Sequence, residues 1–374
     1  MTEEELLQVI EKAAAEEWTE LDLSGNELTV LPPEIGKLTR LKKLVLGKFE
    51  RNEDGEIIGI VSNKLKELPK KIGLLVQLEE LQIVENQLSK LPAEIGQLTN
   101  LQSLDLSTNQ LSKLPAEIGQ LTNLQSLDLY NNQLSGLPAE IFQLLNLRLL
   151  DLGHNQIKKL LLEVAQLKCL KVLNLYGNQL NTLPLGISKL VNLESLYIGN
   201  NKLEDISIDM GQMIALKTLD LSSNKFTNLP STVCAIHHLQ KLFLGNEVKF
   251  DYGLHLQFSQ VSHIYVGNKI ANLPPQIGKI TSLITLNLNV NQLSELPAEI
   301  FQLSNLQSLH LNDNQLSILP TEIGELTNLQ SLDLRSNELS NLPETIKKLT
   351  KLETLDLRGN PVPIPPEILG GKEL

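Results

Sequence analysis

Leucine recurs along almost the whole chain at positions that repeat every 23 residues. Each unit contains the pattern L-x-x-L-x-L-x-x-N followed by x-L-x-x-L-P, as in Leu101, Leu104, Leu106 and Asn109. Within L-x-L, apolar and polar residues alternate with the period of a β-strand. The Pro begins a segment that usually reads E-I-x-x-L, and Pro suits the first position of a helical turn. The pattern therefore predicts a short strand followed by a helical turn in each unit.

The Asn that closes each unit keeps the same spacing. It recurs every 23 residues from Asn63 to Asn224 and again from Asn268 to Asn360. After the strand the chain must turn inward, and an Asn side chain can bond the backbone groups that this turn frees. We therefore expect a ladder of structural Asn side chains at Asn86, Asn109, Asn132, Asn155, Asn178, Asn201, Asn224, Asn291, Asn314 and Asn337.

A 23-residue unit with this pattern is typical of a leucine-rich repeat solenoid. We predict an α/β horseshoe of about 15 turns over residues 19–360, with a parallel β-sheet on its concave face and short helices or 3-10 turns on its convex face. Thr2 and Glu5 form a capping box that opens an amphipathic cap helix over residues 1–18. Residues 361–374 are rich in Pro and Gly and are expected to be an edge or linker.

Two insertions interrupt the repeats. The first, near residues 48–59, contains the turn signal Glu53-Asp54-Gly55 and is expected to form a surface hairpin. The second, near residues 246–261, is rich in aromatic residues and leucine. It is either a shortened repeat whose apolar residues are mostly buried or an exposed aromatic loop that contacts a partner.

The charge and the hydropathy of the chain exclude some partners and compartments. A net charge of −12 argues against nucleic acid and against an anionic membrane surface, since both need Lys and Arg. No apolar run is long enough for a transmembrane helix. The N-terminus is acidic and lacks the basic and apolar regions of a secretory signal. We therefore expect a cytoplasmic protein.

Motifs for catalysis or for metal and cofactor binding are missing from the sequence. No G-x-x-x-x-G-K-[ST] occurs, no H-E-x-x-H, and no Cys or His spacing suited to zinc. His310 would lie beside Asn287 and Asp333, but no nucleophile is expected within reach, so it is best explained as polar surface. We assign no catalytic, cofactor-binding or metal-binding residue and expect a chain that is not an enzyme.

Aromatic and aliphatic side chains gather at the predicted concave positions of the middle repeats. Four of the five tyrosines fall there, whereas the outer repeats carry Ser, Thr, Asp and Arg. Tyr is favoured at interfaces because it offers contact area and a hydroxyl group at low entropic cost, although it is also common in strands. We expect these side chains to be exposed and to form a partner-binding surface of Tyr130, Leu149, His154, Val172, Tyr176, Tyr197, Phe243, His263 and Tyr265.

An acidic row runs along the same predicted face. It lies between the last two leucines of each strand and includes Asp105, Asp128, Asp151 and Asp220. Like charges on neighbouring strands repel modestly. The row is either a solvated surface that maintains solubility or an acidic trough for a partner with a basic surface.

The two ends of the chain resemble a specific family. The opening, which reads TEEELLQVIEKAAAEEWTELDLSGNELTVLPPEIGKLTRLKKLVLGK, is similar to the start of cyanobacterial Roco proteins, where an insertion likewise follows L-x-L-G-K. The end, LDLRGNPVPIPPEILGGKEL, resembles the last repeat that leads those proteins into their Roc GTPase and COR domains. The resemblance implies a leucine-rich repeat domain N-terminal to a GTPase module, monomeric by itself because Roco dimerisation is attributed to COR.

Two functions are therefore expected. The first is a non-enzymatic protein-interaction module, the recognition and regulatory arm of a Roco-type GTPase, which binds a protein partner or its own downstream GTPase domains. The alternative is a stand-alone bacterial leucine-rich repeat protein, a surface or effector protein that binds host or envelope components. Export from the cell would favour the alternative.

Overall fold

The computed structural model describes residues 1–246 and 267–362. These residues fall into two compact units, one formed by residues 1–179 and the other by residues 180–246 and 267–362. His263, Tyr265, almost all of the second insertion and residues 363–374 lie outside the described residues.

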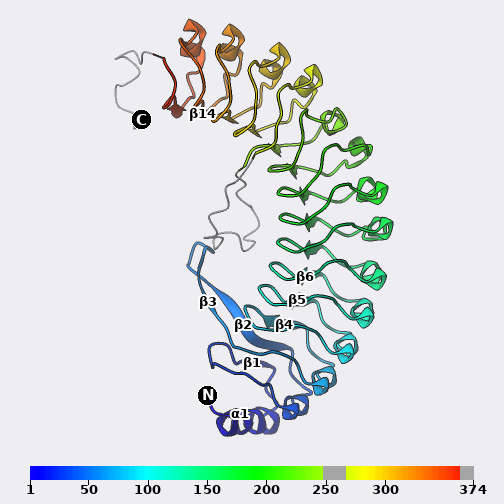
Figure 1. Cartoon of the computed structure of the whole chain (residues 1–374). Helices are drawn as coiled ribbons and strands as arrows, with labels where there is room; N and C mark the ends of the chain where they lie inside the picture. Colours follow the sequence, from blue (N-terminus) through cyan, green and yellow to red (C-terminus); the bar gives the residue numbers. More distant parts are fainter. Residues whose placement is uncertain (247–266, 363–374) are drawn as a thin grey trace. The chain divides into compact units, whose positions relative to one another are not determined.

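The first unit begins with helix α1 (Glu3–Ala15) and continues as a stack of strands and 3-10 helices (Figure 1). Its strands are β1 (Glu20–Asp22), β2 (Lys43–Arg51), β3 (Ile57–Val61), β4 (Glu80–Ile83), β5 (Ser103–Asp105), β6 (Ser126–Asp128), β7 (Leu149–Asp151) and β8 (Val172–Asn174). Its 3-10 helices are η1 (Pro33–Lys37), η2 (Lys70–Leu74), η3 (Ala93–Gln97), η4 (Ala116–Gln120), η5 (Ala139–Gln143) and η6 (Leu162–Gln166). All of these strands pair in parallel and in chain order except β3, which pairs with β2 alone.

The second unit repeats the same design. Its strands pair in parallel and are β9 (Ser195–Tyr197), β10 (Thr218–Asp220), β11 (Lys241–Phe243), β12 (Thr285–Asn287), β13 (Ser308–His310), β14 (Ser331–Asp333) and β15 (Thr354–Asp356). Its described 3-10 helices are η7 (Leu185–Lys189), η8 (Met210–Gln212), η9 (Val233–Ala235), η11 (Pro275–Lys279), η12 (Ala298–Gln302), η13 (Thr321–Glu325) and η14 (Glu344–Lys348). The predicted α/β solenoid, with parallel strands, short 3-10 turns and an N-terminal helix, is confirmed.

The leucine columns explain why the repeats stack in register. Leu81, Leu104 and Leu127 are directly paired on neighbouring strands, and each is at most 1% exposed. Burial of each such side chain contributes about 1.5–3 kcal/mol. On the other side of the stack, the 3-10 helices approach closely at glycines: a Cβ on Gly96 would lie 2.6 Å from the carbonyl oxygen of Glu117. A one-residue slip would therefore break both the core and the convex packing.

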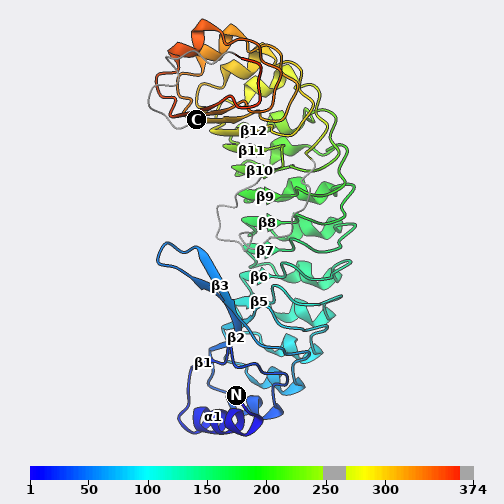
Figure 2. The same ribbon diagram turned by 60° about the vertical axis from the view of Figure 1, so that its left-hand side comes forward.

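The first insertion forms an antiparallel hairpin of β2 and β3 that stands out from the sheet (Figure 2). Its turn contains Gly55 at φ +81°, and the Nδ2 and Oδ1 atoms of Asn52 both bond to Glu56. At the N-terminus, both bonds of the capping box form between Thr2 and Glu5. They begin α1, whose apolar face covers the first repeat.

Candidate functional site

The Asn that closes each repeat is a structural group in both units. Asn132 shows the pattern: its Nδ2 donates to the carbonyls of Leu106, Leu129 and Tyr130 at 3.0–3.3 Å, and its Oδ1 accepts the N–H of Leu111 at 3.0 Å. The side chain is buried and joins two repeats. The same set of bonds is seen at most of the predicted positions, including Asn109, Asn155, Asn314 and Asn337. These amides are occupied by the backbone and hold the turn rather than a ligand.

The Asp residues of the concave row also bond to the backbone. Each carboxylate accepts the N–H of the residue two positions later: Asp105 from Ser107 at 3.0 Å, Asp128 from Tyr130 at 2.9 Å. The same bond measures 2.8 Å at both Asp151 and Asp220. Such a bond stabilises the tight turn after the strand.

The expectation of a solvated acidic row is wrong for three of the four Asp residues named from the sequence. Asp128 is 6% exposed, and Asp151 and Asp220 are fully buried, whereas Asp105 is half-buried. Burial disfavours the charged form and raises the pKa of Asp128 to about 7 and that of Asp220 to about 7, although the turn N–H bonds oppose the shift. Asp128 and Asp220 therefore carry only part of a negative charge at neutral pH.

Three rings from successive repeats of the first unit form what we call the aromatic cluster: Tyr130, His154 and Tyr176. The ring centroids of Tyr130 and His154 lie 5.2 Å apart in an edge-on arrangement, and those of His154 and Tyr176 lie 5.5 Å apart. Both distances fall within the range of favourable aromatic pairs. Glycines leave room for the rings, because a Cβ on Gly153 would lie 3.1 Å from Tyr130, and one on Gly177 would lie 3.2 Å from His154.

Leu149 and Val172 belong to the same surface. They are directly paired on β7 and β8, one position before the inward-pointing Leu of each strand. Leu149 and His154 are half-buried, whereas Val172, Tyr130 and Tyr176 are only 6–7% exposed. The expectation that the tyrosines stand exposed is therefore wrong, because the rings pack against one another and over the neighbouring glycines. The accessible part of this surface is Leu149, His154 and the ring edges.

In the second unit, Tyr197 and Phe243 lie on either side of Asp220, on β9 and β11. Tyr197 is fully buried and Phe243 is 8% exposed, so the expectation of exposed rings is wrong here too. Strands spaced by about 4.8 Å leave no gap for water between large neighbouring side chains. Tyr197 and Phe243 therefore form a packed layer around the buried carboxyl group of Asp220, not an exposed surface.

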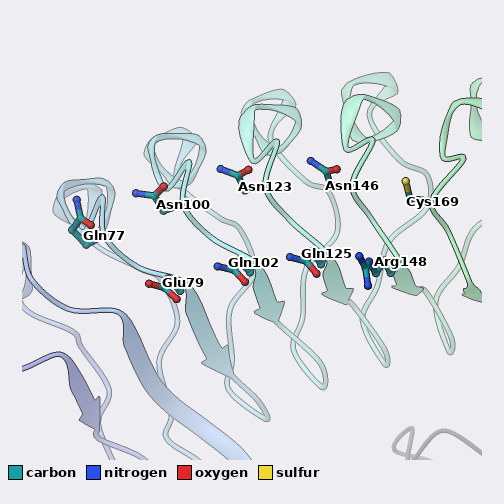
Figure 3. Close-up of a pocket in the computed structure, with 9 residues that line it drawn as sticks. All are labelled: Gln77, Glu79, Asn100, Gln102, Asn123, Gln125, Asn146, Arg148 and Cys169. Atoms are coloured by element: carbon teal, nitrogen blue, oxygen red, sulfur yellow. The ribbon is translucent and has the colours of Figure 1, made fainter.

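The first unit has a second feature, which we call the lateral groove and which the sequence does not predict. It has a volume of about 530 Å³ and runs along the flank of four to five repeats (Figure 3). One wall consists of Asn100, Asn123 and Asn146, from the turns that follow the 3-10 helices, and the other of Gln102, Gln125 and Arg148, at the starts of the strands. Gln77 and Glu79 lie at one end, and the exposed Cys169 lies at the other. The signal in the sequence is the repeated pair in L-T-N-L-Q, which looks like ordinary polar surface.

The described residues contain no group of three or more His, Cys, Asp or Glu side chains that could hold a metal ion. No helix in this part of the chain is long and apolar enough to cross a membrane.

The repeats match known family models over more than half of the chain. The model described as leucine rich repeat matches residues 76–134, 122–180, 191–247, 281–339 and 305–362. A two-copy repeat model matches residues 170–209, and a single-repeat model matches residues 17–38. The chain belongs to the leucine-rich repeat family. Proteins of this family are generally non-enzymatic interaction modules, and no catalytic family is among these matches.

Solved leucine-rich repeat structures resemble the chain along most of its length. A leucine-rich repeat protein of Leptospira interrogans is 38% identical, with 94% of this chain and 93% of that chain covered and a TM-score of 0.70. An internalin of Listeria monocytogenes is 25% identical over 93% of this chain and 92% of its own, with a TM-score of 0.72. A plant receptor kinase ectodomain from Arabidopsis thaliana, in complex with CASPARIAN STRIP INTEGRITY FACTOR 2, is 32% identical over 90% of this chain and 38% of its own, with a TM-score of 0.67. A search of curated proteins gives no match.

Proposed function

We propose that this leucine-rich repeat chain binds a protein partner on the concave face of its first unit, at the aromatic cluster. The aromatic cluster carries the proposal, because three rings from three repeats lie within 5.2–5.5 Å of their neighbours. Family membership supports it, since leucine-rich repeats generally serve in protein interactions. The plant receptor shows that a similar fold is found in complex with a protein factor.

The partner would meet Leu149 and His154 first and then the edges of the two tyrosine rings. Tight anchoring side chains of this kind can each contribute about 2 kcal/mol or more to binding. Asp128, beside Tyr130, carries only part of a negative charge at neutral pH, since its pKa is raised to about 7. We therefore infer that apolar and aromatic complementarity selects the partner, rather than a basic surface.

The test replaces two tyrosines by Ser, the residue found at the same position in another repeat. Tyr130 is the counterpart of Ser107, whose N–H makes the same bond to the Asp two residues earlier. The variant Tyr130→Ser/Tyr176→Ser therefore keeps the turn bond while it loses both rings. We expect the affinity for a partner captured with the wild-type chain to fall at least about tenfold, as measured by titration.

The matched control is Arg335→Ser/Arg358→Ser, which removes the side chains at the same repeat position in the last repeats. We expect its affinity to change by less than about twofold, because these arginines lie in the second unit, far along the chain from the aromatic cluster. An unchanged affinity in the tyrosine variant, with its melting temperature retained, would contradict the proposal.

We infer further that this module is the recognition and regulatory arm of a Roco-type GTPase. The support is the resemblance of the two ends of the chain to cyanobacterial Roco proteins. An immunoblot of the source cells should then show a cytoplasmic band well above 41.6 kDa, and partner binding should differ between the GTP-bound and GDP-bound states. A band near 41.6 kDa would contradict this assignment.

The alternative is a surface or effector protein that binds host or envelope components. What favours it is the match to the Leptospira protein and to the internalin over 92–93% of their own chains. It predicts that the protein is found outside the cytoplasm when cells are fractionated. The aromatic cluster would bind a partner in either case, so fractionation separates the two assignments without testing the site itself.

A further inference from the structure

The asparagine wall of the lateral groove is held in place by hydrogen bonds between repeats. The Nδ2 of Asn100 donates to the carbonyl of Val76 at 2.8 Å, that of Asn123 to Thr99 at 2.8 Å, and that of Asn146 to Thr122 at 2.9 Å. Because each amide nitrogen is held by the backbone, each Oδ1 has a set direction. The wall therefore presents a row of preoriented acceptors, one per repeat.

The side chains of the opposite wall can donate hydrogen bonds to a ligand, and the two glutamines can also accept them. Within the part of the chain that the structure describes, the side chains of Gln102, Gln125 and Arg148 make no hydrogen bond or ion pair, and Figure 3 shows them in line along the groove. Glu79, at the far end, is bound to Lys42 at 2.8 Å. Arg148 is thus the unpaired charge among the described groove residues, and the side chains between Glu79 and Arg148 are neutral amides.

The polar groups that line the groove recur once in each repeat. Residues 88–106 and 111–129 are identical, so the two central repeats offer the same pair of amides at the same spacing. Neighbouring parallel strands are about 4.8 Å apart. Identical groups at a constant interval suit a polymer that presents identical groups at a similar interval.

We propose that the lateral groove binds a linear polysaccharide, one sugar unit per repeat. Sugar hydroxyl groups both donate and accept, as the two walls require, and an extended pyranose unit is comparable in length to the repeat spacing. An extended peptide advances about 3.4 Å per residue and would fall out of phase with the amides. A carboxylate-bearing sugar would be favoured at the Arg148 end.

This inference goes beyond the proposed function, because the groove uses no residue of the aromatic cluster. A chain could bind a protein on its concave face and a glycan on its flank at the same time. The two activities would then fail independently, since Tyr130→Ser/Tyr176→Ser leaves the groove intact and the groove variants leave the rings intact.

The experiment titrates the full chain with cellohexaose and with hexagalacturonate by calorimetry. The groove variant is Gln102→Ala/Gln125→Ala. Its matched control is Gln110→Ala/Gln133→Ala, which removes exposed amides from the same two repeats outside the groove. We expect at least one hexamer to bind wild type and control equally and to bind the groove variant about tenfold more weakly, since two sets of hydrogen bonds are lost.

Chain length provides a second readout. Affinity should rise from the disaccharide to the tetrasaccharide and then level off, because the two walls span four repeats from Glu79 to Arg148. The proposal is overturned if neither hexamer binds with a Kd below about 1 mM, or if the groove variant binds as the control does. It is also overturned if a Gly-Ser decapeptide binds with the same dependence on the two glutamines.

Discussion

Asp128 and Asp356 hold the same place in the repeat, in the middle of the first unit and at the end of the second. Each accepts the N–H two residues later, from Tyr130 at 2.9 Å and from Arg358 at 3.2 Å. Their pKa values nevertheless shift in opposite directions. Burial raises the pKa of Asp128 to about 7, whereas the Arg358 guanidinium bonded to Asp356 lowers the pKa of that carboxyl group. The repeat sets the backbone role of the residue, and its neighbours set its charge.

The contrast between raised and lowered pKa values of these Asp residues also occurs within each unit. In the first unit, burial alone would raise the pKa of Asp22, but bonds from Lys48 and Ser24 outweigh it and lower the pKa. In the second unit, no such cation among the described residues bonds to Asp220, and burial raises its pKa to about 7. Lys48 lies at the base of the hairpin, so the first insertion supplies a charge partner to the first repeat.

Asn174 and Asn287 occupy the same position without any charge. Asn174 is fully buried, and its Oδ1 accepts the Tyr176 N–H at 2.9 Å; the corresponding bond from Asn289 to Asn287 is 3.0 Å. An amide therefore makes the turn bond as well as a carboxylate does. The two residue types can be exchanged to isolate the cost of the charge.

The largest effect is expected for Asn174→Asp. The Nδ2 of Asn174 donates to Asp151 Oδ1 at 2.9 Å, so the variant places two carboxyl groups side by side in a buried layer. We expect a loss of about 3 kcal/mol or more in the free energy of unfolding at pH 8, because a buried charge without a partner is costly. Urea unfolding of both proteins at pH 8 measures it.

The same variant should regain most of that loss at pH 4, where the added carboxyl group is protonated. The folded-state pKa of such a group lies above its unfolded value, so its cost appears only as the pH rises. A loss of equal size at both pH values would show that shape, not charge, decides which residue occupies this position.

Asp128→Asn is expected to stabilise the protein at alkaline pH. The folded-state pKa is about 7 and the unfolded value about 4, so wild type loses stability as the pH rises from about 4 to about 7. The amide keeps the Tyr130 N–H bond and carries no charge. We expect a gain of about 2–4 kcal/mol at pH 8 and a change below about 1 kcal/mol at pH 4, measured by urea unfolding.

Asp220→Asn repeats this test in the second unit and should behave in the same way, since burial raises the pKa of Asp220 for the same reason. If both variants are less stable than wild type at pH 8, the carboxylates are paired in the folded protein and the contrast with Asp356 disappears.

The sequence predicts the features that repeat and not those that depend on neighbours. The strand, the turn and the Asn ladder follow from a 23-residue period, because each unit must meet the same backbone demands. The burial of Asp128 does not follow, since the same residue type at the same position is half-buried at Asp105. The neighbouring residues differ: Asp128 is followed two positions later by Tyr130, which packs on His154, whereas Asp105 is followed by Ser107.

The candidate surfaces were predictable to different degrees. The positions of Tyr130, His154 and Tyr176 on one face follow from the period, but their ring contacts depend on two glycines in the adjoining repeats. The lateral groove was not predictable, because its amides are common surface residues in the sequence. They become a groove only when stacking aligns Asn100 with Asn123 and Gln102 with Gln125 (Figure 3).

The smallest effect is expected for Asp356→Asn, with the opposite dependence on pH. The folded-state pKa of Asp356 is lowered, so its contribution is present above the unfolded pKa of about 4 and is lost as the pH falls further. Both Arg358 and Arg335 contact the carboxylate, but they are 61% and 41% exposed, so solvent weakens the ion pairs. We expect the Tm to fall by about 1 °C at pH 7, and less in high salt, because surface ion pairs are screened. Thermal unfolding at low and high salt measures this, and a rise in Tm at pH 7 would place Asp356 in the same class as Asp128.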